Sequence, residues 1–285
     1  MNSPVRAALA VASLALLAAC APDAPNPAGP PPASLSTFNR AGYDQPGAHR
    51  QYGVPRKVGD GMARAYVVRD EKSDAPLELG IALDARALGG LPTSGMHEYL
   101  LPLPAQAPAP YQLVELDWNP QGHDPAPAYG VPHFDFHFYT ISLAERNAID
   151  PSDPQFAAKA SNLPVGDYVP PFYVVPGPPA ALAVPHMGLH WSDVRSPELQ
   201  GLLGHPERYQ PFTKTFIYGS WNGRFIFYEP MITRAYLRSQ PNVVTPIPVP
   251  QKYPLPGFYP DSYRVAYDAQ AKEYRVALSD LTLQP

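Results

Sequence analysis

The sequence predicts an all-β fold, either a barrel or a sandwich of short strands, with a few short helices and proline-rich loops. Proline supplies 40 of the 285 residues, about 14 % where ~5 % is usual. Because proline removes backbone donors from strands and interrupts helices, long elements of either kind are disfavoured. Short runs of apolar and aromatic residues between turn signals indicate strands instead, and no repeat of fixed period is present.

The charge pattern argues against a nucleic-acid partner. Charged residues make up 16 % of the chain, the net charge is -4 at pH 7, and no run of Lys or Arg occurs. Nucleic-acid binding normally leaves a basic patch or stripe as its electrostatic footprint. We therefore expect no nucleic acid among the partners.

Residues 1–19 are predicted to be a signal peptide. Arg6 supplies a positive charge, and the apolar run at residues 7–19 is too short to span a bilayer. The run ends in Leu-Ala-Ala followed by Cys20, which matches the lipobox of bacterial lipoproteins and predicts lipidation of Cys20. Cys20 is also the only cysteine, so a disulfide within the chain is excluded. The alternative is an ordinary secretory signal followed by an incidental cysteine.

Residues 20–37 are predicted to be the lipidated cysteine and a tether. The segment is rich in Pro and Ala and cannot bury a core. We therefore expect a cell-envelope protein whose membrane partner is reached through a lipid anchor, with the folded part exposed to the periplasm or the exterior. Ala21, directly after the cysteine, resembles the pattern of outer-membrane lipoproteins.

Residues 38–285 are predicted to form a single β-rich globular domain. Strands are expected at residues 65–68, 77–83, 96–102, 111–118, 131–139, 263–267 and 274–278. The clearest hairpin spans residues 213–229, because the Asn-Gly pair at 222–223 is a strong turn signal between two aromatic strands. Capping and N1-proline signals predict short helices from residue 142, after 153, from 196 and over 230–239.

The centre of the sequence is the strictly alternating stretch at residues 131–139. Side chains two apart on a strand share a face. One face should carry His133, Asp135 and His137, and the other face carries three phenylalanines that belong in a core, namely Phe134, Phe136 and Phe138. A His-Asp-His face opposite a core is unusual, and it predicts a chemical site or the wall of a polar cavity.

A second close pair of histidines extends this candidate site. His133 with His137, and His186 with His190, have the same H-x3-H spacing, and His123 lies ten residues before the first pair. Glu229 closes an aromatic strand. The candidate metal ligands are His133, Asp135, His137, His186, His190 and Glu229.

Strand geometry restricts how these residues share an ion. Residues four apart on a straight strand are ~13 Å apart, whereas Zn–N bonds are ~2.1 Å long. His133 and His137 can therefore share one ion only if the strand bends, while either histidine can share one with Asp135. Gly188 allows a tight turn that would bring His186 and His190 together. The expected cofactor is one divalent transition metal, zinc with three histidines or iron with two histidines and a carboxylate.

Several motifs together resemble an uncharacterised family of exported bacterial proteins, a domain of unknown function typed on a Thermus protein. They lie at residues 117–125, 133–139, 186–191, 218–223 and 229–233. The resemblance covers roughly residues 50–240. It implies a β-rich exported domain and implies no activity, substrate or functional residue.

These observations favour a cell-envelope lipoprotein with a histidine-rich site for a divalent metal. The alternatives are a non-catalytic protein that binds a small-molecule ligand in a polar cavity, and a structural protein whose interior histidines are hydrogen-bonded. Whether the protein is an enzyme stays open, because no nucleophile signature is present. The serine at 220 is one place early for G-x-S-x-G.

We predict that Cys20→Ser releases the protein from the membrane. Several acyl chains anchor stably and one anchors weakly, so loss of the modified thiol should move the protein from the membrane to the soluble fraction. Mass spectrometry of the wild-type N-terminus provides the check. A soluble wild type without lipid would contradict the prediction.

Overall fold

The computed structural model describes residues 48–285. The predicted signal peptide, Cys20 and tether lie outside the described residues, so they stay predictions. Within the described part of the chain, no helix is both long and apolar enough to cross a membrane.

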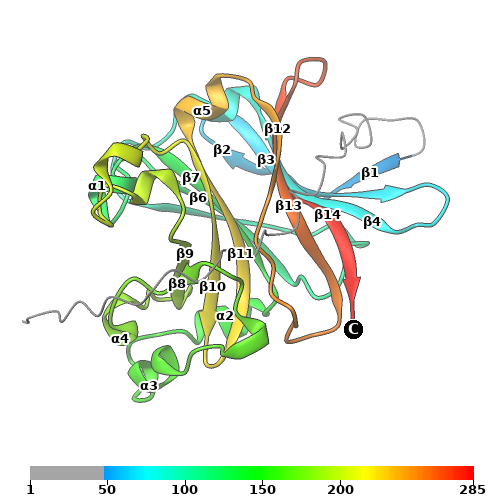
Figure 1. Ribbon diagram of the computed structural model, residues 1–285. Coiled ribbons are helices and arrows are strands. Elements are labelled where there is room, and N and C mark those ends of the chain that lie inside the picture. The colour runs from blue at the N-terminus through cyan, green and yellow to red at the C-terminus, as the bar shows by residue number, and fades with distance from the viewer. Residues whose placement is uncertain (1–47) are drawn as a thin grey trace, which may run out of the picture. The chain divides into compact units, whose positions relative to one another are not determined.

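Two antiparallel sheets of seven strands each form the fold (Figure 1). The first sheet consists of β1 (Ala48–Tyr52), β2 (Arg56–Val58), β3 (Gly61–Asp70), β4 (Pro76–Asp84), β12 (Asn242–Pro246), β13 (Gly257–Asp268) and β14 (Glu273–Gln284). Its strand order is β1-β3-β4-β14-β13-β12, with β2 paired to β3.

The second sheet carries the central stretch in its interior. It consists of β5 (His97–Leu101), β6 (Leu113–Asn119), β7 (His133–Tyr139), β8 (Tyr173–Val174), β9 (Leu189–Asp193), β10 (Lys214–Trp221) and β11 (Arg224–Thr233). The order β5-β6-β7-β11-β10-β9-β8 places β7 between β6 and β11. Both sheets are open, so the all-β prediction is confirmed and the sandwich, not the barrel, is the form it takes.

The helices are short, as predicted. They are α1 (Ala126–Tyr129), α2 (Leu143–Asn147), α3 (Phe156–Ser161), α4 (Pro179–Leu182) and α5 (Arg234–Arg238), with 3-10 turns η1 (Ala85–Leu88), η2 (Gly166–Tyr168), η3 (Pro197–Leu199) and η4 (Pro206–Arg208). The capping box that predicts α2 is present, with Ser142 as its N-cap and Glu145 as the reciprocal partner. The helix predicted over 230–239 forms only as α5, because Pro230 lies in β11 opposite Phe216 and Thr233 provides the cap.

The main core lies between the two sheets. The phenylalanine face of β7 is fully buried in it, together with apolar residues of β4, β13 and β14 from the first sheet. Tyr228 packs against Tyr259 with ring centroids 5.8 Å apart, and Phe216 packs against Tyr263 at 5.5 Å. Both pairs join a residue of the second sheet to one of the first.

A second apolar cluster covers the other face of the second sheet. It joins sheet residues such as Phe227 and Met231 to residues of the connecting segments, among them Tyr129, Ile149 and Phe212. This cover buries the polar face of β7 as well, since His133, Asp135 and His137 are 0 %, 4 % and 0 % exposed. β7 is therefore buried on both faces, one apolar and one ionisable.

The predicted hairpin at residues 213–229 is confirmed by β10 and β11. Trp221 pairs with Arg224, and both turn residues have positive φ, 46° for Asn222 and 87° for Gly223. Two positive φ values in a two-residue turn are the pattern of a type I′ hairpin, which is why the Asn-Gly pair is a reliable signal.

We predict that Gly223→Val destabilises the fold, because a β-branched residue is strained at φ 87°. The cost should be about 1–3 kcal/mol, seen as a fall of several degrees in the melting temperature. Gly201→Val is the matched control, since its added Cβ meets the Tyr209 ring at an ordinary 3.6 Å. Equal melting temperatures for the two variants would contradict the turn assignment.

Candidate metal centre

The polar face of β7 continues across the neighbouring strands. On β6, Glu115 lies opposite His137, Asp117 opposite Asp135, and Asn119 opposite His133. On β11, the pairs Tyr228–Phe138 and Met231–Asp135 place Glu229 across from His137. Imidazoles and carboxylates thus share one buried face. The buried polar residues that β6, β7 and β11 contribute to this face are Glu115, Asp117, Asn119, His133, Asp135, His137, Glu229 and Thr233.

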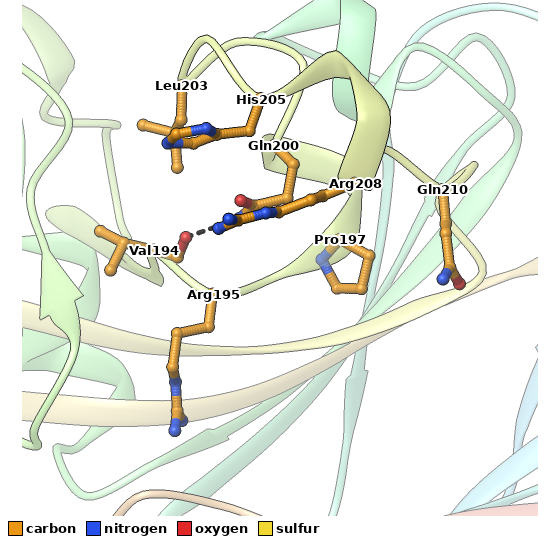
Figure 2. A pocket seen from close by; sticks show the side chains of 8 residues that line it. All are labelled: Val194, Arg195, Pro197, Gln200, Leu203, His205, Arg208 and Gln210. Atoms are coloured by element: carbon orange, nitrogen blue, oxygen red, sulfur yellow. Dashed lines mark hydrogen bonds between the residues drawn. The ribbon is translucent and has the colours of Figure 1, made fainter.

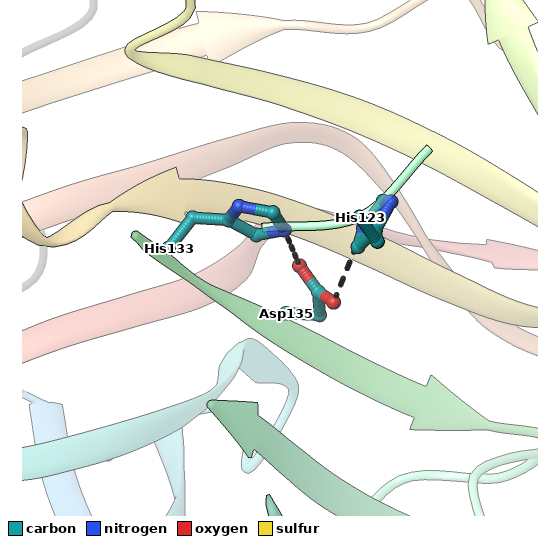
Figure 3. A group of neighbouring side chains, drawn as sticks. All are labelled: His123, His133 and Asp135. Atoms are coloured by element: carbon teal, nitrogen blue, oxygen red, sulfur yellow. Dashed lines mark ion pairs between the residues drawn. The ribbon is translucent and has the colours of Figure 1, made fainter. Parts of the chain in front are cut away.

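His123, His133 and Asp135 form the first group of potential ligands (Figure 3). The Nε2 of His133 lies 3.2 Å from Oδ1 of Asp135, and the Nε2 of His123 lies 3.7 Å from Oδ2. One ligand atom from each residue lies within 4.8 Å of the others. The two imidazoles therefore face the same carboxylate, His133 at Oδ1 and His123 at Oδ2.

The outer nitrogen of each imidazole is fixed by a backbone carbonyl. Nδ1 of His133 is 2.7 Å from the Val131 oxygen, and Nδ1 of His123 is 2.8 Å from the Asp124 oxygen. A carbonyl oxygen only accepts, so both Nδ1 atoms donate and carry the proton. In a neutral ring Nε2 then presents a lone pair to the carboxylate. Such an arrangement needs a positive species between the groups, either a proton or a metal cation.

The loop between β6 and β7 delivers His123 to this position. The loop turns at Gly122 (φ 69°), where an added Cβ would lie 2.1 Å from the Tyr129 carbonyl oxygen. The His123 amide donates to the same Tyr129 oxygen at 3.3 Å. The side chain consequently folds back over the start of β7. Sequence reasoning left His123 out of the ligand set, and its only signal was a histidine in a turn joining two adjacent strands.

His137, His190 and Glu229 form a second group. The Nε2 atoms of His137 and His190 lie 3.5 Å and 3.6 Å from the same oxygen, Oε2 of Glu229. His190 comes from β9, where it pairs with Gly219 of β10. Gly219 is required there, because a Cβ would lie 1.9 Å from the ring of Phe227, which packs against both imidazoles.

A third group lies behind the second and shares His137 with it. It consists of Glu115, Asp117 and His137. Nδ1 of His137 is 3.3 Å from Oδ2 of Asp117. Arg146, from α2, lies 2.6 Å from Glu115 and 3.1 Å from Glu98. Arg146 therefore brings positive charge to the carboxylates of β5 and β6.

Burial dominates the protonation of these groups. Burial and then the charge of Asp117 raise the pKa of Glu115 to about 7. Burial also raises the pKa of Asp117 and of Glu229 well above their usual values, which shifts both carboxyls toward the neutral acid. Burial and the charge of His137 lower the pKa of His190 to about 3. His190 is thus a neutral imidazole at physiological pH, the form that binds metals.

The predicted ligands do not meet around one centre, which corrects the expectation of a single coordination sphere. His133 and Asp135 belong to the first group, and His137, His190 and Glu229 belong to the second. The reason lies in the elements beside β7, since His123 of the preceding loop faces Asp135, whereas Glu229 of β11 lies next to both His137 and His190 of β9.

His186 joins none of these groups. Gly188 does form a tight turn, with its carbonyl accepting from Val184 at 2.8 Å. His186 and His190 nevertheless share none of the three groups. The His186 amide donates to the Ile149 oxygen. His186 therefore does not belong to the group that His190 forms with His137 and Glu229.

A cleft of about 520 Å³ lies elsewhere, and Figure 2 shows its lining. It is formed by the segment after β9, with the side chains of Val194, Arg195, Pro197, Gln200, Leu203, His205, Arg208 and Gln210. Arg195 is paired with Asp193 at 2.7 Å, and the Gln200 amide donates to the Val194 oxygen at 2.8 Å. None of the candidate metal-ligating residues lines this cleft.

A family model matches part of the chain. The model of the TTHB210-like family, described as hypothetical protein TTHB210, matches residues 72–118. This confirms the resemblance to an uncharacterised Thermus family over the segment from the β3–β4 turn to β6, which includes Glu115 and Asp117. The description assigns no function. Neither the curated proteins nor the solved structures yielded a match.

The first group predicts a pH dependence for metal-free protein. Burial alone would lower the pKa of His123, but its hydrogen bond to Asp135 and the carboxylate charge raise it overall. Burial would likewise raise the pKa of Asp135, but His133 and His123 hold it far below its usual value. The ion pair of His123 and Asp135 therefore stabilises the fold fully between about pH 4 and pH 6.5, the pKa values of Asp and His in an unfolded chain. This stabilisation is lost as the pH rises through the folded-state pKa of His123, and it is also lost as the pH falls through the folded-state pKa of Asp135.

We predict that His123→Gln lowers the melting temperature of EDTA-treated protein most near pH 5.5 and much less at pH 9. Differential scanning calorimetry at the two pH values provides the measurement. The same difference at both values would mean that His123 and Asp135 do not form an ion pair.

Proposed function

We propose that this chain is a cell-envelope lipoprotein that binds a divalent transition metal through His123, His133 and Asp135. The observation that carries the proposal is the orientation of the two imidazoles. Both donate Nδ1–H to backbone carbonyls and aim Nε2 at one buried carboxylate. A backbone carbonyl on the outer nitrogen is the usual partner of a metal-bound histidine.

The spacing of the donor atoms suits an ion of this class. With metal–ligand bonds of ~2.1 Å, neighbouring donors on a tetrahedral or octahedral ion are roughly 3.0–3.4 Å apart. His133 Nε2 and Asp135 Oδ1 are 3.2 Å apart, and His123 Nε2 lies 3.7 Å from Oδ2. One ligand atom from each of the three residues lies within 4.8 Å of the others, so His123, on the loop, would have to move closer to share the ion.

The surroundings of the group support the same proposal. Asn119 donates to Oδ2 of Asp135 at 2.7 Å, which orients the carboxylate. The His123 side chain is 38 % exposed while that of His133 is 0 %, so an ion can enter from the loop side. Two histidines and one carboxylate leave coordination positions free and suit zinc or iron. Such an ion could act as a Lewis acid or hold a small ligand.

The alternative function is a non-catalytic ligand-binding or structural role, in which a proton takes the place of the metal. His123 would then be an imidazolium paired with Asp135, and the raised pKa of His123 favours this state in metal-free protein. Metal binding distinguishes the two functions, because the protonated pair of His123 and Asp135 needs no metal at any pH.

We predict that untagged full-length protein binds zinc and that His133→Gln weakens this binding more than tenfold. Glutamine keeps a polar side chain but removes the Nε2 lone pair. Isothermal titration calorimetry after EDTA treatment measures the affinity, and the melting temperature should rise on addition of zinc. His186→Gln is the matched control and should bind as the wild type does. Wild-type affinity in His133→Gln, or no zinc binding at all, would contradict the proposal.

A further inference from the structure

We infer that a second divalent cation binds at His137, His190 and Glu229, independently of the first. Both ring nitrogens of His137 and Oε2 of Glu229 are buried and have no hydrogen-bond partner among residues 48–285. Both side chains are 1 % exposed. Each buried polar atom without a hydrogen bond costs about 1–3 kcal/mol of folding free energy. A bound cation would remove this cost by pairing with these atoms.

The distances fit a cation better than direct hydrogen bonds. Nε2 of His137 and Nε2 of His190 lie 3.5 Å and 3.6 Å from Oε2 of Glu229. Protein N–H···O hydrogen bonds span 2.7–3.2 Å, so both gaps are too long. Donors around one ion with bonds of ~2.1 Å are roughly 3.0–3.4 Å apart. A small contraction would therefore give all three donors a common ion.

Asp117 acts as a positioning residue for this site. Its Oδ2 lies 3.3 Å from Nδ1 of His137, on the side of the ring opposite Glu229. A carboxylate behind a histidine directs the Nε2 lone pair toward the metal and makes it a better donor. Asp117 itself is fully buried, so it cannot turn toward solvent.

The second site is separate from the first and open on one side. Ions that share a bridging ligand are ~3.5–4 Å apart, whereas the two groups have no residue in common and lie two positions apart on β7. The His190 side chain is 28 % exposed, against 1 % for His137 and Glu229. Water or a small anionic ligand would therefore reach the ion from the side of His190. Two histidines and one carboxylate suit zinc or iron(II).

Zinc stoichiometry of untagged full-length protein tests the inference, with titration calorimetry and elemental analysis as readouts. Wild type and the His186→Gln control should bind two ions per chain. Glu229→Gln and His190→Gln should each bind one, and His133→Gln should also bind one. A single ion whose binding survives Glu229→Gln but not His133→Gln would overturn this inference alone. A single ion with the opposite pattern would overturn the first site alone.

Asp117→Asn separates positioning from a merely structural role. It should weaken the second site about 10- to 100-fold and leave the affinity of the first site unchanged. A fall in both affinities, together with a lower melting temperature of metal-free protein, would overturn the positioning role. Glu229→Gln is close in shape to the wild type and removes a buried acid, so its circular dichroism spectrum should match the wild type and confirm that lost binding is not lost folding.

Discussion

Both faces of β7 are buried, and this double burial determines how the second sheet is covered. Its phenylalanine face fills the core between the sheets, while its opposite face carries His133, Asp135 and His137 and is equally buried. A sandwich needs only one covered face per sheet. The additional cover comes from long connections whose apolar side chains pack over the second sheet, so these proline-rich segments serve to enclose a polar interior.

Enclosure changes the chemistry of the ionisable groups. Glu115, Asp117 and Glu229 are shifted toward the neutral acid, although Arg146 supplies positive charge next to Glu115 and Glu98. Backbone carbonyls hold the imidazoles of His123 and His133, whose Nε2 atoms face Asp135. The two ring nitrogens of His137 face Asp117 and Glu229 without a hydrogen bond to either. Metal cations would turn these unpaired lone pairs into bonds, which is why we relate the burial to metal binding.

Strand periodicity made the fold class, the β10–β11 hairpin and the common face of His133, Asp135 and His137 predictable from the sequence. The partition of the ligands was not predictable, because it depends on the register of β7 against β6 and β11 and on its distance from β9. His123 reaches Asp135 through a loop, and no short-range pattern encodes that contact. His186 lies outside the three groups although Gly188 forms the expected tight turn, because such a turn does not by itself fix where the residues before it lie.

An anomalous difference map from crystals grown with zinc tests the central claim most directly. Data collected on either side of the zinc absorption edge locate the ion without any assumption about its ligands. We expect a peak bonded to Nε2 of His123, Nε2 of His133 and a carboxylate oxygen of Asp135. A map with no peak between these residues, in crystals that contain zinc elsewhere, would contradict it.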